Sequence, residues 1–172
     1  MIDRVLIDAL KFKSKPLSLR WKEKIRSFPE LKHYNALEDE MLISLIESIF
    51  PLLAGYLENG LDKSAFGGYF VRMGKSSVTH GFPLSETLYG LHLSQEIILK
   101  YMESEITMDG SVALYQAISV TAKIAGFFLL GCYYLNRGFQ EGTIEKITAN
   151  EKIPKELLIK YYKDDFFFKK ED

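Results

Sequence analysis

This 172-residue sequence has very little cysteine and no marked excess of positive or negative charge. Its single cysteine, Cys132, excludes an intramolecular disulfide and a cysteine-based metal site, and it fits a reducing compartment. The 22 basic and 23 acidic residues nearly cancel, so the chain lacks the basic excess that is typical of nucleic-acid-binding domains. Asp3 and Asp8 interrupt the first apolar stretch, which is unlike a secretory signal. We therefore expect a cytoplasmic protein with no nucleic-acid partner.

Long uncharged apolar runs are also scarce. The most apolar stretch, residues 118–135, contains Lys123 together with Ser119 and Thr121. Because a lysine that faces lipid is costly, this stretch predicts a buried core helix and no membrane span.

The motifs of common active sites are missing as well. The sequence has no Gly-x-Ser-x-Gly element and no phosphate-binding loop, so we expect no enzyme activity. Among the three histidines, His92 has a candidate partner at helical spacing, Glu96, but we expect no second pair to complete a metal site. A globin-like sensor that binds haem or another cofactor is the alternative, with His92 and then His80 as the candidate ligands.

What the sequence does contain is helical periodicity. Hydrophobic residues make up 47% of the chain, and apolar positions recur every three or four residues with almost no alternation of period two. We expect an all-α fold, a single domain over residues 1–172 in which four long helices form a bundle and short helices lie at the termini. Asn35 is the expected cap of the first long helix and Pro51 its kink, while Gly81 and Pro83 mark a helix end and the next helix start. The four long helices are expected at about residues 36–58, 63–80, 83–106 and 111–141.

The last of these helices has the most regular apolar pattern. One stripe alternates strictly by four and three residues and is expected to be the bundle seam, so Ile118, Phe128 and Leu135 are predicted to be buried. A second stripe widens the predicted buried face. The first stripe is Leu114, Ile118, Thr121, Ala125, Phe128, Cys132, Leu135 and Phe139, and the second is Val120, Ile124, Phe127 and Tyr134.

Three polar residues, Ser77, Gln95 and Thr121, fall on the apolar stripes of the second, third and fourth predicted long helices. One interpretation is that they form hydrogen bonds within the core, as buried polar groups must. The other is a small internal pocket that Tyr133 and Tyr134 help to close. Both interpretations remain open.

Two segments together resemble a known family. The first runs from Tyr69 to Met102 and contains the turn Gly-Phe-Pro-Leu-Ser-Glu, and the second ends in the letters FFLLGCYYLNRGFQEG. They resemble the RsbRD-type N-terminal helical domain, an input domain of bacterial stress-response regulators and some sensor histidine kinases, over about residues 19–143. The resemblance implies a helical bundle with a sensory or regulatory role, a tendency to self-associate and no catalytic residues. The residues that carry it are Gly81, Pro83, Leu84, Glu86, Tyr134, Gly138 and Glu141.

Apolar residues are in surplus at both ends of the chain, outside the family-like core. A surplus of this kind favours an interaction surface, and we expect a homodimer or a regulatory protein partner. The alternatives are that the ends fold back over their own bundle or dock onto a downstream domain. The candidate interface residues are Leu157, Leu158, Tyr161, Phe166, Phe167 and Phe168.

Overall fold

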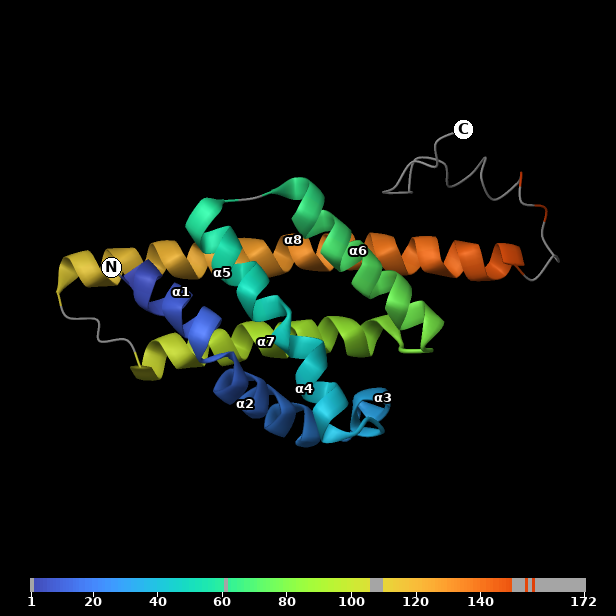
Figure 1. Ribbon diagram of the computed structural model, residues 1–172, viewed down its shortest axis with the longest axis horizontal. Helices are drawn as coiled ribbons and strands as arrows, with labels where there is room; N and C mark the ends of the chain where they lie inside the picture. Colours follow the sequence, from blue (N-terminus) through green and yellow to red (C-terminus); the bar gives the residue numbers. More distant parts are fainter. Residues whose placement is uncertain (1, 61, 106–109, 150–153, 155, 157–172) are drawn as a thin grey trace. The chain divides into compact units, whose positions relative to one another are not determined.

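The computed structural model describes residues 2–60, 62–105 and 110–149, together with residues 154 and 156. Within these ranges the regular structure is all α-helical, without a strand, which confirms the predicted fold class (Figure 1). The candidate interface residues of the tail, Leu157 to Phe168, lie outside the described residues. The helices are α1 (Ile2–Phe12), α2 (Ser14–Arg26), α3 (Lys32–Asn35), α4 (Asp39–Glu47), α5 (Ile49–Asn59), α6 (Lys63–Thr79), α7 (Leu84–Glu105) and α8 (Ser111–Ala149).

The first predicted long helix is instead the two helices α4 and α5, which are separated at Ser48. Pro51 explains this break, since it has no N–H to donate to the carbonyl of Glu47 and its ring crowds that carbonyl. The expected cap, Asn35, was also wrong. It ends α3, and its side-chain amide donates a hydrogen bond of 2.7 Å to the Phe28 carbonyl oxygen.

The described chain divides into two compact units, and α7 and α8 contribute to both. Of the described residues, the first unit contains 2–60, 62, 88–105 and 110–129, and the second contains 63–87, 130–149, 154 and 156. The expected single domain remains a prediction.

Large aromatic side chains fill the core of the first unit. Phe50 and Phe127 are fully buried, and Trp21 is 2% exposed. The Trp21 indole N–H donates to the carbonyl oxygen of Gly90 at 2.9 Å, and the Tyr34 ring meets the indole edge-on. This bond joins residues that lie 69 positions apart in the sequence, and it holds α2 against α7 within the unit.

Glycines determine the packing of the second unit. A Cβ on Gly74 of α6 would overlap the Leu135 carbonyl oxygen, and one on Gly138 of α8 would overlap the Val71 carbonyl oxygen. The backbones of α6 and α8 therefore approach more closely than side chains at these positions would allow.

The predicted seam of α8 is wrong in the first half of the helix. Leu114 is 54% and Ile118 is 61% exposed, whereas Phe128 and Leu135 are buried as predicted. A strict repeat of 3.5 residues drifts by about 20° per heptad on a helix with 3.6 residues per turn, so one stripe does not stay on one face. From Phe128 onward the members of the predicted stripe are buried or half-buried. The residues buried before that point are Ala117, Val120, Ile124 and Phe127, and the last three confirm the second predicted stripe, whose fourth member, Tyr134, is half-buried.

Candidate functional site

An uncovered apolar surface lies on α8 within the first unit, opposite the buried residues. Leu114, Ile118 and Leu129 are 54%, 61% and 76% exposed. Their spacing places them on one side of the helix, and the smaller residues between them are exposed too. We call this surface the α8 face, and its residues are Leu114, Ile118, Thr121, Ala122, Ala125 and Leu129.

The α8 face carries no charge. From Ser111 to Asn136 the sequence has a single charged residue, Lys123, and its Nζ lies 3.3 Å from the Asp3 carboxylate of α1. Isolated exposed apolar residues are ordinary on a protein surface, but a continuous apolar surface usually marks an interaction site. The α8 face is therefore the strongest candidate for a functional surface in the first unit.

Two helical stretches, Asp39–Asn59 and Ser111–Ala149, are long and apolar enough to cross a membrane by length and composition alone. The core helices of soluble proteins meet the same criterion, so this finding is weak evidence for a span. The expected absence of a membrane span remains a prediction.

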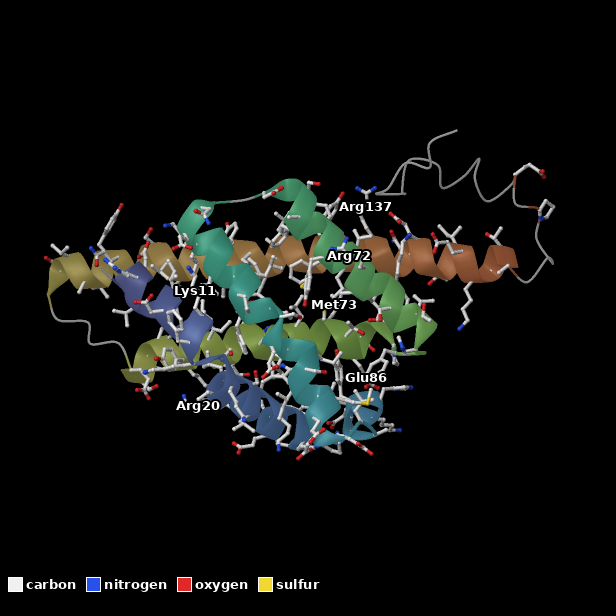
Figure 2. The ribbon with its side chains drawn as sticks, viewed as in Figure 1. Lys11, Arg20, Arg72, Met73, Glu86 and Arg137 are labelled. Carbon is white, nitrogen blue, oxygen red and sulfur yellow. The ribbon has the colours of Figure 1, made fainter. Side chains whose placement is uncertain are left out.

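A cleft of about 580 Å³ lies beside α1 in the first unit. It is lined from α1, the end of α5 and the start of α8, and three carboxylates, Asp3, Asp8 and Glu58, contribute to the lining. Lys11, labelled in Figure 2, forms an ion pair of 2.7 Å with Glu58. The lining contains no histidine or cysteine, and no group of three or more ligating side chains suited to a metal occurs among the described residues.

The second unit contains a buried carboxylate that pairs with a lysine. Glu141 of α8 is fully buried, and its Oε2 lies 3.0 Å from Nζ of Lys75 on α6. Lys75 also meets Oε1 of Glu145 at 2.9 Å. Burial lowers the pKa of Lys75, but its hydrogen bonds with Glu145 and Glu141 outweigh that effect, and the pKa lies above its usual value. The lysine thus remains charged and compensates the buried carboxylate.

The residues that carry the family resemblance all belong to the second unit. Gly81 has φ of 75°, the left-handed conformation expected after a helix end, and the Phe82 N–H donates to the Ser77 carbonyl oxygen at 2.8 Å. Pro83 directly precedes α7, and Glu86 in its first turn is 8% exposed (Figure 2). These residues therefore have local roles in turns and packing, whatever further role they serve.

The predicted pocket residues are divided between the units. Ser77 is buried, donates to the Met73 carbonyl oxygen at 3.0 Å and accepts from the Thr87 hydroxyl at 3.3 Å, which matches the core interpretation. Tyr133 is exposed and Tyr134 half-buried in the second unit, while Gln95 is half-buried and Thr121 exposed in the first. A pocket common to all five remains a prediction.

Both candidate cofactor ligands are exposed. The His92 ring lies 6.0 Å from the Tyr89 ring, and Nδ1 of His80 lies 2.8 Å from the Ser76 carbonyl oxygen. These surroundings do not single out either histidine as an axial ligand.

Sequence reasoning missed the exposure of the α8 face and the ion pair of Glu141 with Lys75. The exposure of the α8 face follows from the drift of a strict 3.5-residue repeat around the helix. The glycines of α8 indicate the ion pair less clearly. Gly138 and Gly142 flank Glu141 and mark the line along which α6 approaches.

Comparison of the chain with protein-family models, with curated proteins and with solved structures gave no match. The resemblance to the RsbRD-type domain therefore remains a prediction.

Proposed function

We propose that this chain is a non-catalytic sensory or regulatory domain of the cytoplasm that acts through protein association, first of all with a second copy of itself. The observation that carries the proposal is the α8 face, where Ile118 and Leu129 are 61% and 76% exposed on a helix whose other side buries Ile124 and Phe127. Covering such a surface with protein removes apolar area from water and stabilises the complex.

One further consideration supports a binding role. The resemblance to an input domain of stress-response regulators implies the same class of function.

Static light scattering of the intact chain, with an absorption spectrum of the freshly purified protein, tests this proposal. We expect a dimer at micromolar concentration and no absorption beyond that of the aromatic side chains. A monomer across micromolar concentrations, or a Soret band in the spectrum, would contradict the proposal, and a Soret band would favour the cofactor-binding alternative.

A further inference from the structure

The positions of the α8 face pair off about a midpoint. The midpoint lies between Thr121 and Ala122. Leu114 and Leu129 lie at equal distances on either side of it, and so do Ile118 and Ala125. When a second copy runs in the opposite direction about this midpoint, Leu114 meets Leu129 and Ile118 meets Ala125, which is one of the two-fold arrangements open to identical helices.

We propose that the α8 face packs antiparallel against the α8 face of a second copy, with the two-fold axis beside Thr121 and Ala122. This inference rests on the proposed function, and it specifies the partner, the surface and the direction of the pairing.

The exposed area suits a second copy. The large residues of the α8 face, with Tyr115 at its flank, are 54% to 76% exposed. Together with the small residues between them they present on the order of 600 Å², close to the roughly 800 Å² that each partner contributes to a standard-size interface. Since the face carries no charge, its burial leaves no ion without a partner.

The sizes of the facing residues favour the antiparallel direction. In that arrangement Ile118 meets the small Ala125 of the second copy, and the small Thr121 and Ala122 meet at the axis, where the backbones can approach closely. In a parallel pair each residue faces its own copy, so Ile118 faces Ile118 while Ala125 faces Ala125 across a gap. Facing large and small residues gives the more even helix separation that close packing requires.

Disulfide cross-linking of single-cysteine variants tests the direction. Cys132→Ser serves as the background, and Thr121→Cys is compared with Leu114→Cys in the full-length chain. In the antiparallel pair the two copies of residue 121 are offset by about 1.5 Å along the helix, but the copies of residue 114 are offset by about 22 Å. A disulfide requires Cα atoms within about 7 Å.

We expect mild oxidation to give at least about tenfold more covalent dimer for Thr121→Cys than for Leu114→Cys. A mixture of Leu114→Cys and Leu129→Cys chains should form the mixed disulfide. Equal cross-linking at residues 114 and 121 would indicate a parallel pair and overturn the antiparallel arrangement.

Two further results would overturn the inference in distinguishable ways. A dimer without cross-links at residue 121 would place the interface elsewhere and leave the proposed function standing, whereas a wild-type monomer would remove both. In the latter case, flotation with phosphatidylethanolamine–phosphatidylglycerol vesicles identifies the occupant. Vesicle binding that is lost in Ile118→Glu but kept in the exposed control Met41→Glu would assign the α8 face to a lipid surface.

Discussion

The two halves of α8 are stabilised in different ways. In the first half, residues 111–129, large side chains such as Ile124 and Phe127 are buried on one face, and the opposite face is left to solvent. In the second half, residues 130–149, the buried line includes Gly138 and Gly142, where α6 approaches the helix backbone.

This difference shows that one continuous helix can use two kinds of packing. The first half relies on the burial of apolar side chains, which tolerates modest changes of shape. The second half depends on glycines, which have no side chain and so let the backbones of α6 and α8 come into contact. Such a contact leaves little room for adjustment. Matched substitutions in the two halves should therefore have different effects.

The largest difference is expected between two glycine-to-alanine changes on α8. Gly138→Ala places a Cβ against the Val71 backbone and should lower the free energy of unfolding by more than about 4 kcal/mol. Gly126→Ala meets only the Tyr56 hydroxyl at 3.7 Å and should be neutral or stabilising by up to about 1 kcal/mol. Urea unfolding followed by circular dichroism measures both. Similar losses for the two variants would remove the contrast between the halves.

The next largest effect is expected from Phe128→Ala, which removes a ring that is 2% exposed. Lost transfer free energy and the remaining cavity should lower the free energy of unfolding by about 3–4 kcal/mol. Ile118→Ala serves as the comparison, because its side chain is 61% exposed in the single chain. At a dilution where the chain is monomeric it should cost less than about 1 kcal/mol. A large loss for Ile118→Ala in the monomer would mean that the residue is covered by its own chain.

A smaller effect is expected from the buried ion pair of the second half. Glu141→Gln keeps the shape of the side chain but removes the charge that faces Lys75, and it should cost about 2 kcal/mol, since Lys75 retains Glu145. Glu145→Gln, at a side chain that is 45% exposed, should cost about 0.5 kcal/mol or less. Equal costs for the two variants would show that the burial of Glu141 has no energetic consequence.

The smallest effect concerns the reactivity of Cys132, which lies near the point where the two halves meet. Burial raises the pKa of its thiol above the usual value, so less of the reactive thiolate is present at neutral pH. Alkylation with iodoacetamide should be slower in the folded protein than in urea. Equal rates in the two states would show that the thiol is freely accessible.

The sequence was sufficient for the helical class and for the breaks at Gly60, Gly81 and Gly110, because each of these glycines has a positive φ that other residues rarely adopt. For the buried face of α8 it identified Val120, Ile124 and Phe127 of the second stripe, but the stripe expected to be the seam was the wrong one in the first half. The strict stripe through Ile118 is the more regular one, yet the buried residues follow the helical period of 3.6.

The candidate site was harder to predict than the fold. Hydrophobic patterns identify an apolar stripe but not whether another helix of the same chain covers it, and Leu114 and Leu135 are equally apolar members of one stripe with opposite exposure. The pairing of Lys75 with Glu141 joins residues that are far apart in the sequence, so it depends on the close approach of α6 to α8, which no local pattern specifies.

Sedimentation velocity of the intact chain beside Ile118→Glu, at matched micromolar concentrations, tests the central claim most directly. For the wild type we predict a species with about twice the chain mass of 19.8 kDa. In Ile118→Glu, a charge enters the interface from each copy, and the dissociation constant should rise at least about a hundredfold while helix content stays the same. A wild-type monomer, or a dimer that Ile118→Glu leaves intact, would contradict the assignment of the α8 face as the surface that joins two copies.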